Sequence, residues 1–185
     1  MIKSIARSVA LLLAFTLLPA PFLAGETSKR FETEKEGIQL IGQLEGVARD
    51  IRHNADRLSA FSRDTYISTG THYHHLDQIK SSVNDGLRPV LARLAEIQPQ
   101  LPAWQQDAID QMLASAQALA ADANAAILAK REAGAVPPPL HAEYTDLLAR
   151  IYDRSHALVE TSVAAGDYAE AHLQAVDAGL KVPRN

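Results

Sequence analysis

The stretch Thr71–Lys80, THYHHLDQIK, places three of the chain's seven histidines within four positions. Neutral imidazole nitrogens are common ligands of Zn²⁺ and Cu²⁺ in proteins. His72 and His75 are three residues apart, so on a helix they share one face and can offer two nitrogens to one ion. At about 100° per residue, His72 points with the neighbouring apolar residues, His75 lies on the flank of that face, and His74 points away. The spacing suits either a metal site or the polar end of a helix.

A metal site at this place needs a third ligand from another helix. His141 stands at the start of the last predicted helix, and an antiparallel topology brings that start to the same end of the molecule as His72. The hypothesis is an open zinc or copper site held by His72, His75 and His141, kept neutral near helix N-termini. The competing interpretation is that these rings pack at the wet rim of a bundle and keep a polar edge in water. We favour the second interpretation, because no specific motif such as His-Glu-x-x-His is present.

Other metal and cofactor arrangements fit the sequence less well. Two Asp-x-x-His runs end at His53 and His156, but both histidines are predicted to point away from the core, unlike the inward Glu-x-x-His motifs of di-metal bundles. Met112 and His172 could hold a b-type haem at the other end of the bundle, yet each lies off its apolar seam, and Met112 is more simply core filler. Trp104, the only tryptophan, is expected at a loop or rim, where it could anchor a partner.

The chain carries no motif of a common catalytic type. It lacks a glycine-rich phosphate loop, a nucleophile elbow and an inward pair of carboxylates. The absence of cysteine excludes disulfides, thiolate metal sites, a lipoprotein anchor and covalently attached haem. We therefore expect a non-enzymatic interaction or structural protein that has a protein partner and no cofactor. A metal-binding protein and an enzyme of unmarked chemistry are the alternatives.

Residues 1–25 have the layout of a secretory signal peptide. Two basic residues precede an apolar run, Val9–Leu18, which is too short to span a membrane, and Pro19 follows it. We expect cleavage near Ala24 or Gly25, which would place the protein in the periplasm or outside the cell without a stable membrane anchor.

The charge balance limits the partners further. Removal of the signal peptide takes two of the 18 basic residues and none of the 22 acidic ones, which changes the net charge from −4 to −6. An acidic chain is repelled by phosphate backbones and by anionic lipid. Nucleic acids and anionic membranes are therefore not expected as partners.

Composition and periodicity predict an all-α protein. Alanine and leucine are abundant, whereas glycine and aromatic residues are sparse. Apolar residues recur every three or four positions in four segments, about 33–61, 72–98, 103–131 and 139–179. Long amphipathic helices with short connections predict an antiparallel up-down-up-down four-helix bundle, forming one domain over residues 26–185.

Local signals set the expected helix boundaries. Thr33 and Glu36 have the spacing of a capping box, which predicts a helix start. The apolar stripe keeps its phase through Pro89, which predicts one kinked helix rather than two. Residues 132–140, EAGAVPPPL, have the composition of a linker, and Gly166 marks an alternative break inside the last helix.

Two runs in the middle of the chain, HYHHLDQIK and LPAWQQDAID, together resemble a set of short secreted helical proteins of bacteria. Those proteins share a His-x-x-His-Leu-x-x-Ile-Lys run and a Trp-Gln-Gln-x-Ala-Ile-Asp run. The matching residues are His72, His75, Leu76, Ile79, Lys80 and Trp104–Asp110. The resemblance covers the second and third predicted helices best. It implies a secreted helical bundle and assigns no activity, so it transfers no catalytic residue.

Overall fold

The computed structural model describes residues 21–134 and 141–178, and the side chains of all of these except 21–30 and Asp177. Residues 1–20 of the predicted signal peptide lie outside the described residues. Most of the predicted linker, residues 135–140, and the last residue of the predicted fourth helix, position 179, also lie outside them. The helices are α1 (Pro21–Phe61), α2 (Thr69–Ser81), α3 (Arg88–Ile97), α4 (Ala103–Ala133) and α5 (Ala142–Asp177). A π-helical segment, η1 (Ser82–Leu87), joins α2 to α3, and a short 3₁₀ turn, η2 (Gln98–Gln100), follows α3.

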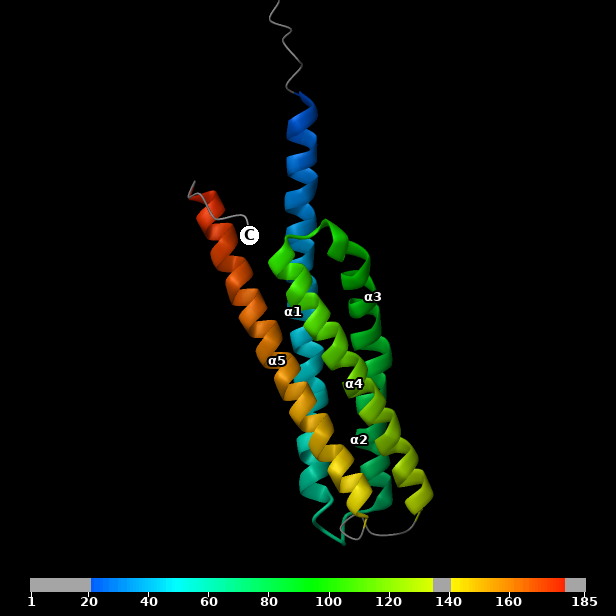
Figure 1. The fold of residues 1–185 in the computed structure, drawn as a ribbon. Helices are drawn as coiled ribbons and strands as arrows, with labels where there is room; N and C mark the ends of the chain where they lie inside the picture. The colour runs from blue at the N-terminus through cyan, green and yellow to red at the C-terminus, as the bar shows by residue number, and fades with distance from the viewer. Residues whose placement is uncertain (1–20, 135–140, 179–185) are drawn as a thin grey trace, which may run out of the picture.

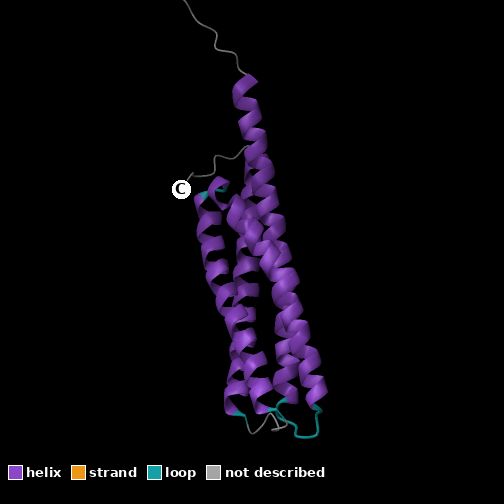
Figure 2. Cartoon of the chain, turned by 90° about the vertical axis from the view of Figure 1, so that its right-hand side faces the viewer, coloured by secondary structure: helices purple, strands orange, loops and turns teal. Residues whose placement is uncertain are grey.

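These elements form the predicted all-α, antiparallel four-helix bundle, because α2, η1 and α3 act as one helical leg. Helix α1 runs down the bundle in Figure 1, the α2–α3 leg runs up, α4 runs down and α5 returns upward. Helix α5 packs most extensively against α1 and α4, while the α2–α3 leg packs against α1 and α4 from the other side. The start of α1 extends beyond the ends of the other helices in both views (Figures 1 and 2).

The helix start predicted at the capping box is wrong. Helix α1 is continuous from Pro21 to Phe61, so Thr33 and Glu36 both lie within it. The charged residues between positions 26 and 36 include good helix formers, which sustain the helix through the pattern. Glu36 pairs across the bundle with Arg93 instead, at 2.6 Å between Oε1 and Nε. The Arg93 guanidinium lowers the pKa of the Glu36 carboxyl.

The second leg passes through Pro89 without a break, as predicted, and its irregular turn is η1. The Arg88 N–H donates to the carbonyl of Val83, five residues back, which is the spacing of a π-helix. A proline inside an α-helix clashes with the carbonyl four residues before it, and a wider turn relieves that clash. The leg begins at Thr69, three residues earlier than predicted, because the Ser68 hydroxyl accepts a hydrogen bond from the Thr71 N–H and caps the helix.

Helix α5 is unbroken through Gly166, so the alternative break predicted there is wrong. Helix α4 ends at Ala133. The next residue, Gly134, is the one described residue with positive φ, 55°, a conformation that glycine adopts without a side-chain clash. Among the described helices, α4 is long and apolar enough to cross a membrane by length and composition, a test that the core helix of a soluble bundle also passes.

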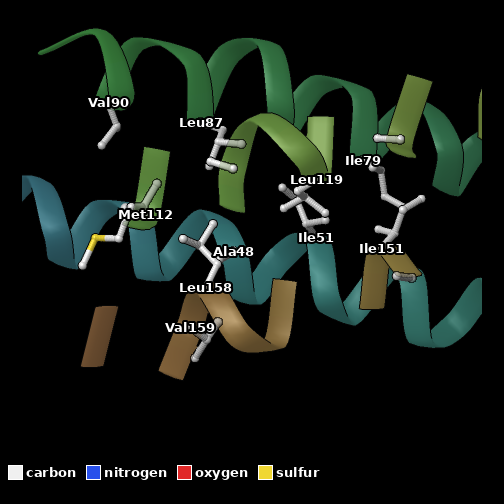
Figure 3. Close-up of a cluster of buried hydrophobic side chains, with 14 of the residues drawn as sticks. Ala48, Ile51, Ile79, Leu87, Val90, Met112, Leu119, Ile151, Leu158 and Val159 are labelled. Atoms are coloured by element: carbon white, nitrogen blue, oxygen red, sulfur yellow. The ribbon is translucent and has the colours of Figure 1, made fainter. Parts of the chain in front are cut away.

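The core runs through the middle of the bundle and draws on every leg (Figure 3). The alanine-rich part of α4 is buried, so small side chains there let the neighbouring helices approach closely. Representative core residues are Ala48, Ile51, Ile79, Leu87, Met112, Leu119, Ile151 and Leu158. Polar side chains collect at the two ends of this core.

Candidate functional site

His72 is fully buried at the end of the bundle where α1 meets α2 and α4 meets α5. Its Nδ1 lies 3.2 Å from the Tyr144 hydroxyl, and its Nε2 is buried without a hydrogen-bond partner. Burial lowers the pKa of His72 to about 4, and the nearby charges of Lys130 and His75 lower it further in the same direction. His72 is therefore a neutral imidazole at physiological pH, and the sequence prediction that it faces the core is confirmed.

His75 lies one turn further along the same helix and is also buried. Its Nδ1 is 2.9 Å from the Asn54 side-chain oxygen on α1, and its ring packs on Phe61 at 5.5 Å between centroids. The ring of His72 meets the same Phe61 edge-on at 6.5 Å. Burial and then the charge of His74 lower the pKa of His75. The two histidines thus flank one aromatic ring.

His141 has a local structural task at the start of α5. Its Nδ1 accepts a hydrogen bond from the Tyr144 backbone N–H at 3.2 Å, which caps the helix. Each of the three predicted ligands therefore already has its Nδ1 in an internal hydrogen bond. Within residues 21–134 and 141–178, no three His, Asp or Glu side chains gather closely enough to hold a metal ion. The zinc or copper site of His72, His75 and His141 stays a prediction.

Lys130 belongs to this end of the bundle and was missed by the sequence reasoning. Only 1% of Lys130 is exposed, its Nζ donates to the Gly134 carbonyl at 3.1 Å, and burial lowers its pKa. The amine also lies 5.9 Å from the centre of the Tyr73 ring. The burial of Lys130 could have been predicted from the sequence, because Lys130 follows Ala123 and Ile127 at helical spacing on the apolar face of its helix.

Burial also raises the pKa of the Tyr144 hydroxyl, which keeps it protonated. The cluster of His72, Tyr144, Lys130 and Tyr73 is therefore a packed polar plug at one end of the core.

The opposite end of the core holds a second buried polar cluster, contributed by α1, α4 and α5. Glu34 Oε1 and His172 Nδ1 lie 3.3 Å apart, within ion-pairing distance, but neither atom makes a hydrogen bond. Gln105 is fully buried with both of its amide atoms unpartnered, and the Trp104 indole nitrogen is buried and unpartnered as well. The Trp104 ring is half-buried and packs 6.1 Å from His172 and 4.7 Å from Tyr168.

The haem arrangement considered for Met112 and His172 does not fit this geometry. Met112 is fully buried and lies beside Ser162, whose hydroxyl is 4.0 Å from the Met112 sulfur. Ser162 is ten residues before His172 in the same helix, about 15 Å along its axis. The two side chains therefore lie at different levels of the bundle, and one iron cannot bind both.

The two Asp-x-x-His runs point away from the core, as predicted. His53 is exposed, and His156 accepts a hydrogen bond from Arg52 at 3.1 Å and lies 3.3 Å from Glu160. Neither run contributes an inward ligand, so a carboxylate-bridged di-metal site is not formed by them.

A surface hollow of about 420 Å³ lies where α1 meets the π-helical turn. We call it the η1 groove. It is lined by Val47, Asp50, Asn54, Gln78, Ser81, Ser82, Asp85 and Gly86. The side chain of Asn54 also binds His75, so the groove reaches the histidine-rich end of the bundle.

The groove depends on a close approach between two backbones. A Cβ on Gly86 would lie 2.9 Å from the Val47 side chain, closer than side chains tolerate. Only glycine lets the π-helical turn sit this near α1.

Comparison with protein-family profiles, with curated proteins and with solved structures gives no match. The likeness of the His-x-x-His and Trp-Gln-Gln runs to secreted bacterial proteins therefore stays a prediction.

Proposed function

We propose that this protein is a non-enzymatic, extracytoplasmic interaction module that binds a partner protein through the η1 groove. The observation that carries the proposal is the groove itself, an open hollow lined mostly by residues with polar side chains and built on an irregular helical turn. π-Helical turns inside longer helices occur frequently at functional sites. The proposal that the protein is not an enzyme is supported by His72, His75 and His141. The Nδ1 atom of each of these histidines is already engaged in an internal hydrogen bond.

The lining favours a basic segment of the partner. Asp50 and Asp85 supply carboxylates, and the amide and hydroxyl groups around them offer further acceptors. The whole chain carries a net charge of −4, which attracts a basic partner over longer distances. A lysine or arginine side chain entering the groove would meet charge-assisted hydrogen bonds.

Photo-crosslinking tests this proposal in the cells that make the protein. A photo-reactive residue replaces Gln78, which is exposed in the groove, and in a matched control it replaces Gln117, which is exposed on α4. We expect a discrete protein adduct from position 78 that Asp50→Asn with Asp85→Asn abolishes, and no such adduct from position 117. Equal adducts from both positions, or an adduct insensitive to the two substitutions, would contradict the groove as the binding site.

A second candidate function is metal binding at the histidine end, supported by the buried, unpartnered Nε2 of His72. A neutral imidazole with a free nitrogen is the form that ligates zinc or copper. Calorimetric titration with Zn²⁺ and Cu²⁺ tests this candidate. We expect binding that His72→Ala and His75→Ala each abolish, and unchanged affinity in both variants would end the idea.

The extracytoplasmic location is part of the proposal and rests on the layout of residues 1–25. Cell fractionation followed by N-terminal sequencing tests it. We expect the exported chain to begin at Gly25 or Glu26. A cytoplasmic protein that keeps Met1 would contradict the location.

A further inference from the structure

We propose that Glu34 and His172 form a binding site for a divalent transition metal, with Gln105 beside them, at the end of the bundle opposite the histidine-rich stretch. This site is independent of the η1 groove and uses none of the residues His72, His75 and His141. Its ligands come from helices α1 and α5, with the amide contributed from α4.

The spacing of the two ligand atoms suits a shared metal better than a hydrogen bond. Glu34 Oε1 and His172 Nδ1 are 3.3 Å apart, and the pair does not have hydrogen-bond geometry. Zinc binds nitrogen and oxygen ligands at about 2.0–2.2 Å, so two ligands at adjacent corners of a tetrahedron lie about 3.4 Å apart. The observed separation therefore matches a tetrahedral edge without rearrangement of either helix.

Both ligands are held away from bulk water. The side chain of Glu34 is 11% exposed and that of His172 is 20% exposed. A buried carboxylate oxygen without a hydrogen-bond partner, such as Glu34 Oε1, is costly, and a bound cation offsets that cost. The carboxylate supplies the negative charge that a divalent ion needs, and the imidazole supplies a neutral nitrogen.

Gln105 is positioned to add an amide oxygen. It is fully buried, and both polar atoms of its side chain lack partners. Its Nε2 would lie 3.6 Å from a Cβ on Gly37, and Gly37 is one helical turn after Glu34 on the same face. The amide therefore faces the same strip of α1 as the carboxylate. Its oxygen and nitrogen can exchange places by a simple flip of the side chain.

An aromatic wall covers the imidazole. The Trp104 ring lies 6.1 Å from the His172 ring, and Tyr168 packs on the far side of Trp104 at 4.7 Å. Trp104 is the chain's only tryptophan, so its fluorescence reports on this site and on no other. A paramagnetic ion bound to His172 would quench that fluorescence from contact range.

A Co²⁺ titration of the purified full chain tests the proposal, because Co²⁺ replaces Zn²⁺ in tetrahedral sites, is coloured there and quenches tryptophan. We expect saturable, one-to-one quenching of Trp104, a visible absorption band of tetrahedral Co²⁺, and reversal of both by Zn²⁺. Absence of saturable quenching in the unmodified protein would overturn the proposal.

Three variants identify the residues that are responsible for Co²⁺ binding. His172→Ala and Glu34→Gln should each weaken Co²⁺ binding at least about tenfold. Glu34→Gln keeps the side-chain shape, so it serves if His172→Ala unfolds, and circular dichroism verifies the fold of each variant. The matched control is His156→Ala, which removes a surface histidine from the same helix and should leave binding unchanged. Equal affinity in Glu34→Gln and the unmodified protein would overturn the proposal.

The test also separates this site from metal binding at the histidine-rich end. Twenty-seven residues of α1 separate Glu34 from Phe61, about 40 Å along the helix. Metal bound at His72 and His75 would leave Trp104 unquenched, and His72→Ala would leave the quenching intact. Quenching that disappears in His72→Ala would assign the ion to the other end and overturn the proposal.

Discussion

Acid should destabilise this protein through His72, and the comparison of the unmodified chain with His72→Gln isolates that effect. The side chain is neutral in the folded state because burial lowers its pKa from 6.5 to about 4. The unfolded chain regains the ordinary pKa, so below pH 6.5 it binds a proton that the folded protein does not. Stability conferred by the neutral ring is therefore fully present above pH 6.5 and is lost as pH falls toward 4.

The magnitude follows from the two pKa values. At pH 4.5 His72 is almost fully protonated in the unfolded chain and about one-quarter protonated in the folded protein. The linkage relation gives a loss of about 2 kcal/mol in the free energy of unfolding between pH 7 and pH 4.5 from this group. The groups that face His72 are Lys130, which is cationic, His75 and the Tyr144 hydroxyl. None of them supplies a negative charge that would hold a proton on the ring.

Urea unfolding followed by circular dichroism at pH 7 and pH 4.5 measures this difference. Glutamine at position 72 can keep a hydrogen bond to Tyr144 and cannot titrate, so the acid-induced loss should be smaller by about 2 kcal/mol in the variant. His75 is retained in both proteins and its contribution cancels. The control is His74→Gln, an exposed position on the same helix, and the change at position 72 must exceed the change there. An identical pH dependence in His72→Gln and the unmodified chain would refute the argument that the ring is buried and neutral.

Three further substitutions test the packing. Gly86→Ala should destabilise the protein by about 1–3 kcal/mol in urea unfolding, because the new Cβ lies 2.9 Å from Val47, and combining it with Val47→Ala should restore most of the loss. Gly166→Ala should stabilise the protein by about 0.5–1 kcal/mol, since no atom lies within 4 Å of the added methyl group and α5 is continuous there, so a lower midpoint would contradict the unbroken helix. Tyr144→Phe removes the partner of His72 Nδ1 and should lower the free energy of unfolding by about 1–3 kcal/mol at pH 7, whereas an unchanged midpoint would show that this hydrogen bond is not formed.

The sequence predicted the fold through periodicity, and the errors came from local signals. The periodicity of the apolar residues correctly predicted the four helical segments of the bundle. Because this periodicity keeps its phase through Pro89, it also predicted that the second segment is continuous. The Thr33–Glu36 pair failed as a boundary because the charged helix formers around it continue the helix. Gly166 failed as a break because one glycine costs only about 1 kcal/mol against a helix packed along its length.

The candidate sites were harder to predict, because they depend on which side chains meet across helices. The prediction that His72 faces the core was correct, because the direction of a side chain around a helix depends on that helix alone. Its contacts with Tyr144 and Lys130 could not be predicted from any single segment, because these residues come from other helices. Glu34 lay inside what was expected to be a helix start, and Gln105 was noted only as part of the Trp-Gln-Gln run. No motif connects these two residues to His172, because three helices contribute them.

The two ends of the core differ in how many of their buried polar atoms make hydrogen bonds. The end with more unbonded atoms is the better candidate for a ligand site. At the histidine-rich end, His72, His75 and Lys130 each have an internal hydrogen-bond partner, and only the Nε2 of His72 is without one. At the other end, both amide atoms of Gln105, a carboxylate oxygen of Glu34 and Nδ1 of His172 are all without one.

Each buried polar atom left unpartnered costs about 1–3 kcal/mol, which is large against a total stability of about 5–15 kcal/mol. Binding of a ligand at these atoms would offset part of that cost. The histidine-rich stretch therefore has internal hydrogen bonds for most of its buried polar groups, whereas Glu34, Gln105 and His172 are the residues for which we propose a ligand.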